Sequence, residues 1–136
     1  MAEYDVSNYA RKTIIELDES YLMQTLNLIS GKWKMNVLML LDFAPSGSLR
    51  YGDIKYILRD VIAPRVLVQQ LRELECSGLV NRVVYPTSPI KVEYSLSELG
   101  KAIIPVMDEM YHFGFIYKES QKKASSQSSS DIDIFK

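Results

Sequence analysis

The sequence predicts a mainly α-helical fold that carries a small β-wing, the arrangement known as a winged helix-turn-helix. The stretch from Val61 to Leu79 has a helical apolar pattern that begins at Pro64 and stops at Gly78. Proline is well tolerated at the first helical position, and glycine tolerates the left-handed position that follows a helix. Two short β-rich runs come next, separated by a Thr-Ser-Pro turn at residues 87–89. A helix, a stop and a β-ribbon in this order are typical of a winged helix.

The chain before this helix is expected to hold an arm and three shorter helices. Residues 1–19 have no clean apolar period and are expected to form an N-terminal arm that pairs with a partner. A first helix follows a cap at Ser20, a second is expected over residues 32–43, and a third over residues 50–58. The side chains expected to face inward from the second and third helices are Trp33, Val37, Leu40, Leu41, Tyr51, Ile54, Ile57 and Leu58.

A long C-terminal helix is expected to open at Ser97 and Glu98, because an acidic side chain suits a helix N-terminus. Apolar residues recur along it with alternating spacings of four and three, which predicts a heptad-like seam for a homodimer. The N- and C-terminal dimerisation helices would then contribute Leu22, Leu26, Leu99, Ile103, Val106, Met110, Phe113 and Tyr117. Residues 20–119 are expected to form one domain, and the serine-rich residues 120–136 a disordered tail.

The helix that begins at Pro64 has two distinct faces. Leu67, Leu71 and Leu74 repeat at helical spacing and predict a buried stripe. The opposite face carries arginines and an amide, the side chains that read guanine and adenine edges in the major groove of DNA. This face is therefore predicted to read base sequence. Its candidate residues are Pro64, Arg65, Val68, Gln69 and Arg72.

The distribution of charge supports contact with nucleic acid better than the net charge of −1 does. Residues 50–91 carry more basic than acidic side chains, whereas residues 1–19 are acidic. A phosphate backbone responds to the local face rather than to the average charge. Contacts to the DNA backbone are expected from the third helix and from the ribbon and its tip, and the candidates are Arg50, Arg82, Thr87, Ser88 and Lys91.

Composition excludes several other classes of protein. One histidine and one cysteine cannot assemble an ordinary zinc site within one chain. There is no nucleophile–base pair, paired-carboxylate motif or glycine-rich phosphate loop, so no metal, no cofactor and no catalytic residue are expected. No apolar run reaches about 18 residues, so no membrane contact is expected. The lone cysteine fits a reducing cytoplasm.

Four motifs together resemble the HxlR type of winged-helix transcription regulators, which are related to the MarR type. They are I-S-G-K-W-K at 29–34, R-Y-G-D-I at 50–54, V-L-V-Q-Q-L-R-E-L-E-C-S-G-L-V at 66–80 and V-E-Y-S-L-S-E-L-G at 92–100. The resemblance covers roughly residues 20–117. It implies a homodimeric DNA-binding regulator in which the second helix of the helix-turn-helix reads bases and the wings flank the groove.

The sequence departs from the family pattern at three positions. Many members carry a sensing thiol before the first core helix, where this chain has Ser20, so that mechanism is not carried over. Ala63 and Val68 replace hydroxyl side chains that are common in the family, and an apolar Val68 suits contact with a thymine methyl group. The only cysteine, Cys76, is expected to be a partly buried small side chain rather than a sensor.

The function predicted from the sequence is that of a sequence-specific regulator that binds a palindromic operator as a homodimer. The alternative is a winged helix used only for contact with other proteins, whose basic face would be incidental. Salt-dependent binding to DNA separates the two hypotheses. A pocket for a small-molecule effector between Trp33, the first helix and the C-terminal helix is a further hypothesis.

Overall fold

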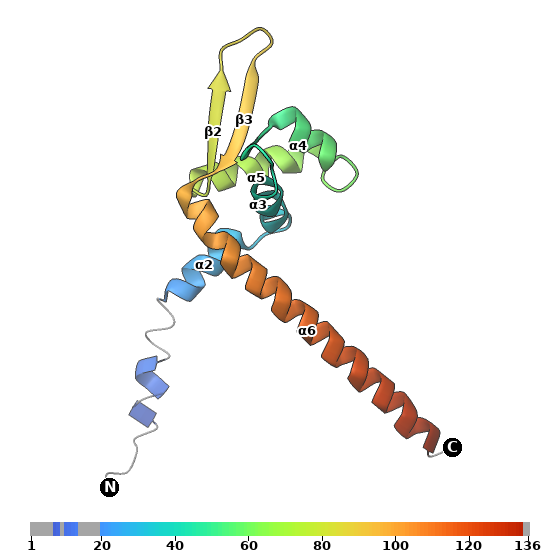
Figure 1. Ribbon diagram of the computed structural model, residues 1–136. Helices are drawn as coiled ribbons and strands as arrows, with labels where there is room; N and C mark the ends of the chain where they lie inside the picture. Colours follow the sequence, from blue (N-terminus) through green and yellow to red (C-terminus); the bar gives the residue numbers. More distant parts are fainter. Residues whose placement is uncertain (1–6, 9, 14–19, 135–136) are drawn as a thin grey trace.

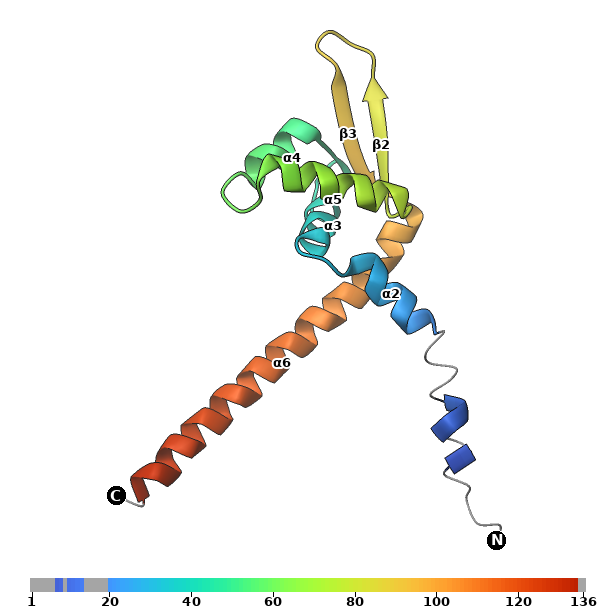
Figure 2. The ribbon, with the colours of Figure 1, turned by 180° about the vertical axis from the view of Figure 1, so that it is seen from behind.

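The computed structural model describes residues 7–8, 10–13 and 20–134, with side chains up to residue 127. Most of the predicted N-terminal arm and the last two residues of the predicted tail lie outside the described residues. A winged-helix body sits at one end, and one long helix leaves it on the side away from the wing tip (Figures 1 and 2). The elements in chain order are α2 (Tyr21–Ile29), α3 (Lys34–Asp42), β1 (Ser48–Arg50), α4 (Tyr51–Ile57), α5 (Pro64–Cys76), β2 (Val80–Tyr85), β3 (Lys91–Leu96) and α6 (Glu98–Ile134).

The hydrophobic core forms around α3, which packs against α5, α6 and β3. The predicted inward positions Val37, Leu41 and Ile54 are buried, and so is Leu38, which the spacing did not single out. The prediction for Ile57 was wrong: it lies in the last turn of the short helix α4, whose inward side is occupied by Ile54, and it is 48% exposed. The buried side chains are Ile29, Val37, Leu38, Leu41, Ile54, Ile62, Leu67, Leu71, Leu74, Leu79, Val80, Tyr94, Leu96, Ile104 and Met107.

Helix α5 begins and ends where the sequence predicts. Pro64 occupies its first turn, and Ala63 at the N-cap makes no side-chain capping hydrogen bond. At the other end the Leu79 N–H donates to the Leu74 carbonyl at 3.1 Å, and the Gly78 N–H donates to the Glu75 carbonyl at 3.0 Å. With Gly78 at a φ of 82°, these bonds form a Schellman motif that closes the helix.

The sheet has three strands in the order β1-β3-β2, and the neighbours are antiparallel. The predicted ribbon of β2 and β3 is confirmed, with Val80 opposite Leu96 and Tyr85 opposite Lys91. Strand β1 was not predicted, because its three residues are too few to show the alternation that reveals a strand. It exists because it pairs with β3, whose partner residues lie more than forty positions away along the chain.

The start of α6 is fixed by two hydrogen bonds of one serine side chain. The Ser97 hydroxyl donates to the Gly78 carbonyl at 2.6 Å and accepts from the Gly100 N–H at 3.0 Å. The Ser97 N–H also donates to the Leu79 carbonyl at 3.0 Å. Helix α6 comes so close to this junction that a Cβ at position 100 would overlap the Leu79 carbonyl oxygen. Helix α6 thus starts where the sequence predicts, at Ser97 and Glu98, and the close approach of the Leu79 backbone explains why position 100 is a glycine.

The structure differs from the predicted disordered tail, because α6 continues to Ile134. Polar composition argued for disorder, but a helix that is already formed extends without the cost of nucleation. Glu119, Lys122 and Lys123 are also good helix formers, and Lys122 pairs with Glu119 at 3.4 Å. Proline 105 lies within the helix without ending it. None of the helices that the structure describes is long and apolar enough to span a membrane.

The structure also corrects two smaller sequence inferences. Cys76 in the last turn of α5 is exposed rather than partly buried, because the buried face of the helix is occupied by the leucine stripe. Ser20 lies at the N-cap of α2 but makes no side-chain capping hydrogen bond there. Trp33 lies at the N-cap of α3 in a left-handed conformation, with a φ of 84°, and is half-buried.

Replacing Gly100 with alanine should destabilise the protein by about 2 kcal/mol or more, because the added methyl group meets backbone rather than a flexible side chain. Chemical denaturation measures the change in the free energy of unfolding. Gly52→Ala is the matched control, since a Cβ there meets no atom within 4 Å. It should leave stability unchanged or raise it by up to about 1 kcal/mol. Equal stability of both variants would contradict the steric account of Gly100.

Candidate nucleic-acid interface

The predicted reading residues lie together on one face of α5. Pro64, Arg65, Val68, Gln69 and Arg72 line an open groove of about 680 Å³, together with Tyr51 and Glu73. Helical periodicity explains this arrangement, because residues three and four positions apart share a face while the leucine stripe is turned into the core. The groove is therefore built by one helix, with α4 contributing Tyr51 at its edge.

The two arginines of this face are available to a ligand. Arg65 and Arg72 are exposed, and neither forms an ion pair within the part of the chain that the structure describes. Val68 lies between them and is 39% exposed. The face thus offers two guanidinium groups, which can bind guanine edges or phosphate, on either side of one apolar side chain.

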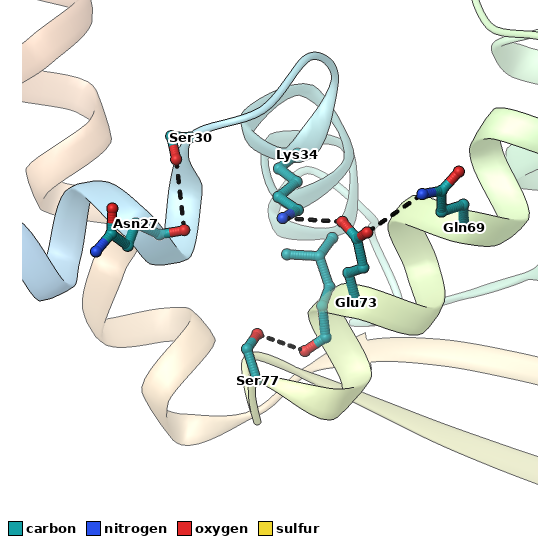
Figure 3. A network of polar contacts seen from close by, with 7 residues as sticks. Asn27, Ser30, Lys34, Gln69, Glu73 and Ser77 are labelled. Carbon is teal, nitrogen blue, oxygen red and sulfur yellow. Dashed lines mark hydrogen bonds and ion pairs between the residues drawn. The ribbon is translucent and has the colours of Figure 1, made fainter.

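An acidic side chain on the same helix is held by a lysine from α3 (Figure 3). The Lys34 ammonium lies 3.0 Å from the Glu73 carboxylate, and the Gln69 amide nitrogen donates to the other carboxylate oxygen at 3.4 Å. The hydrogen bond from Lys34, followed by that from Gln69, lowers the pKa of Glu73. Sequence reasoning missed this network, because Lys34 and Glu73 are far apart in the chain and no local period links them.

The two basic side chains of the wing, Arg82 and Lys91, differ in their surroundings. Arg82 on β2 is exposed and has no ion-pair partner among the described residues. Lys91 on β3 instead pairs with Glu93 at 2.9 Å and lies 4.8 Å from the centre of the Tyr85 ring. The hydrogen bond from Lys91, with a smaller effect from the charge of Arg50, lowers the pKa of Glu93. The Lys-x-Glu spacing could have revealed the pair, since alternate residues of a strand share a face.

A second groove joins the wing tip to the start of α4. It has a volume of about 610 Å³, and its lining includes Arg50, Thr87, Ser88 and Lys91, which were predicted from the sequence. The Thr87 hydroxyl donates to the Pro89 carbonyl at 2.8 Å, which folds the tip of the ribbon back on itself. Tyr51 lines both grooves, so all the predicted backbone contacts except Arg82 border a surface that adjoins the reading face.

The predicted dimer residues do not belong to this surface. They lie on α2 and α6, and α6 extends away from the wing and from α5 in both ribbon views (Figures 1 and 2).

The HxlR-like helix-turn-helix family model matches residues 28–122, which is more than half of the chain. The chain belongs to the HxlR family.

Similar proteins agree with this assignment. An uncharacterized HTH-type transcriptional regulator of Methanothermobacter thermautotrophicus is 41% identical over 113 residues, covering 81% of this chain and 83% of the relative. The crystal structure of the HTH-type regulator ytcD has a TM-score of 0.64 at 39% identity and covers 74% of this chain and 98% of its own. A MarR-family regulator from Porphyromonas gingivalis W83 has a TM-score of 0.63 at 30% identity, covering 71% and 91%. This HxlR-family protein is a DNA-binding transcription regulator, not an enzyme.

Replacing residues of the reading face should change base preference, whereas replacing wing residues should weaken binding to all sequences alike. Arg72→Ala or Gln69→Ala should reduce the free-energy difference between binding the preferred base and binding another base by about 1–3 kcal/mol, which is the contribution of one bidentate base contact. Arg82→Ala should reduce the steepness of the plot of log affinity against log salt concentration, lowering its slope by about 1 in magnitude. Lys91→Ala should do so less, because Glu93 already neutralises that charge. Fluorescence anisotropy on specific and random duplexes measures both, and equal losses for Arg72→Ala would show that the reading face is misassigned.

Proposed function

We propose that this HxlR-family regulator binds a palindromic DNA operator as a homodimer. The observation that carries the proposal is that one chain has two different exposed surfaces, which suit two different partners. One is the reading face of α5, whose two arginines have no ion-pair partner among the residues that the structure describes, and the other is an exposed apolar seam on α6. The proposed DNA-binding and dimerisation unit spans residues 20–119, and its location is the cytoplasm.

The apolar seam favours a second copy of the chain as partner. Leu99 is 64% exposed and Phe113 is 66% exposed, although helix residues of this size are usually covered. Val106, Met110 and Phe113 also line an open groove of about 630 Å³ on α6. Of the predicted seam, only Ile103 packs against the core of its own chain. A matching helix from a second copy would bury the remaining residues by heptad packing.

Helix α2 extends the proposed interface. Its exposed apolar side chains include Leu22 at 60% and Leu26 at 37%, and a single buried residue, Ile29, anchors it to the core. A nine-residue helix with one anchoring side chain gains most of its stability from packing. A partner that covers both α2 and α6 therefore suits the apolar surface of each.

The proposed contacts to DNA follow from the two grooves. Helix α5 enters the major groove, where Arg65, Gln69 and Arg72 read base edges and Val68 contacts a thymine methyl group. Pro64 places the start of α5 close to the sugar–phosphate backbone of the DNA. The phosphate contacts are made by the wing and by the start of α4, and their residues are Arg50, Arg82, Thr87, Ser88 and Lys91.

Regulation by a small-molecule effector near Trp33 stays a prediction. Trp33 is half-buried and lies where α3 begins, with the Lys32 ammonium 5.0 Å from the centre of its ring. Because Ser20 stands where many family members carry a sensing thiol, oxidation at that position is not part of the proposal.

Dimerisation should be lost when charge is placed in the seam. The double variant Val106→Glu, Met110→Glu should sediment as a monomer, because four carboxylates would be buried in the dimer without partners. Analytical ultracentrifugation at micromolar concentration measures this. Glu109→Gln is the control, since this exposed side chain lies in the same groove and the change adds no charge. A wild-type chain that sediments as a monomer would contradict the dimer.

The operator should have two-fold symmetry with half-sites about one helical turn apart, or a small multiple of it. Two recognition helices related by a dimer axis meet successive major grooves on one side of the duplex, roughly 34–36 Å apart. Selection of bound duplexes from a random library, followed by footprinting, tests this. Enrichment of a single unrepeated half-site would contradict the palindrome, and binding that is absent or insensitive to salt would favour the protein-contact alternative.

A further inference from the structure

Glu73 fixes the orientation of the Gln69 side-chain amide. An ionised carboxylate only accepts hydrogen bonds, so the amide group that approaches it at 3.4 Å must be the nitrogen. The Gln69 oxygen is thereby turned away from Glu73, as Figure 3 shows. Both residues line the groove of the reading face, so the orientation of this amide decides what a base edge would meet there.

Lys34 makes this orientation a property of the fold rather than of one helix. Its ammonium lies 3.0 Å from Glu73, and its side chain is only 16% exposed. Because Lys34 belongs to α3 and Glu73 to α5, the ion pair joins the reading helix to the central helix of the core. The hydrogen bonds from Lys34 and Gln69 also lower the pKa of Glu73, a direction that favours the ionised carboxylate. The acceptor that holds Gln69 is therefore both charged and positioned.

We infer that Glu73 is a positioning residue that makes Gln69 select adenine over guanine at one base pair of the operator. With one N–H donated to Glu73, the amide presents an oxygen acceptor and one remaining N–H to the groove. Adenine offers a matching donor at N6 and acceptor at N7, whereas guanine offers only acceptors at O6 and N7. The inference rests on the proposed function, because it requires α5 to read bases in the major groove.

The adenine position is found with the wild-type protein and one variant. A random duplex library is selected with the full chain, and the base pair whose preference disappears in Gln69→Ala is the one that Gln69 reads. We expect adenine at this position in the wild-type selection. Guanine there would overturn the inference while leaving sequence-specific binding, and with it the proposed function, in place.

The role of Glu73 is tested by an isosteric change with a matched control. In Glu73→Gln the new side chain both donates and accepts, so the Gln69 amide is free to turn and offer its nitrogen to guanine. The ratio of the affinities for two duplexes that carry adenine or guanine at the position read by Gln69 should fall by about fivefold or more. Glu75→Gln removes the same charge from the same helix. It should leave the affinity ratio unchanged, because no hydrogen bond among the described residues joins Glu75 to Gln69.

Three outcomes complete the test. In the Gln69→Ala background, Glu73→Gln should have no further effect on the ratio, because the two residues act through one contact. A ratio that is unchanged in Glu73→Gln, with thermal unfolding like that of the wild type, would overturn the inference alone. A wild-type chain that enriches no sequence would overturn the inference and the proposed function together.

Discussion

The arrangement of this protein depends on one crowded junction, where α5 ends, β2 begins and α6 starts. The carbonyl groups of Gly78 and Leu79 accept from the hydroxyl and the N–H of Ser97, and Gly100 lets α6 lie against the same backbone. A left-handed glycine, a capping serine and a helix glycine are all needed within a few ångströms. Because α5, the wing and α6 meet here, their relative directions are fixed by the hydrogen bonds of Ser97 and by the close approach of Gly100 to the Leu79 backbone.

Ion pairs of two acidic side chains shape the charge of the proposed DNA-binding surface. Glu73 beside the reading face is held by Lys34, and Glu93 on the wing is held by Lys91, so both carboxylates are neutralised in place. The cations without such partners in the described part of the chain include Arg65, Arg72 and Arg82. Although the net charge of the chain is −1, these three arginines therefore give the proposed DNA-binding surface positive charge that no acidic side chain pairs within the described residues.

The long helix α6 serves two purposes with different residues of its first turns. Ile104 and Met107 are buried against the body, while Val106 and Met110 face outward beside them. A helix that contributes to the core on one side and stays apolar on the other is incomplete as a monomer, which is the physical basis of the proposed homodimer. Dimerisation would also set the spacing of two reading helices, so the apolar seam and the DNA-binding face are parts of one geometric requirement.

Local periodicity in the sequence determined much of this protein. The leucine stripe of α5, its start at Pro64, its stop at Gly78 and the two-stranded wing could all be predicted, because helix and strand periods are contained in neighbouring residues. The arginines and the amide of α5 followed from the same spacing, since they occupy the face opposite the leucines.

Only the tertiary structure decided which distant groups meet. It added β1 to the sheet, extended α6 through the serine-rich segment, placed Lys34 against Glu73 and brought Arg50 to the wing tip. It also exposed Ile57 and Cys76, which the sequence had placed inward or partly inward. The reason is physical: a period states which side of an element is apolar, whereas the partner of a charge or of a short strand depends on which surfaces the folded chain brings within a few ångströms of each other.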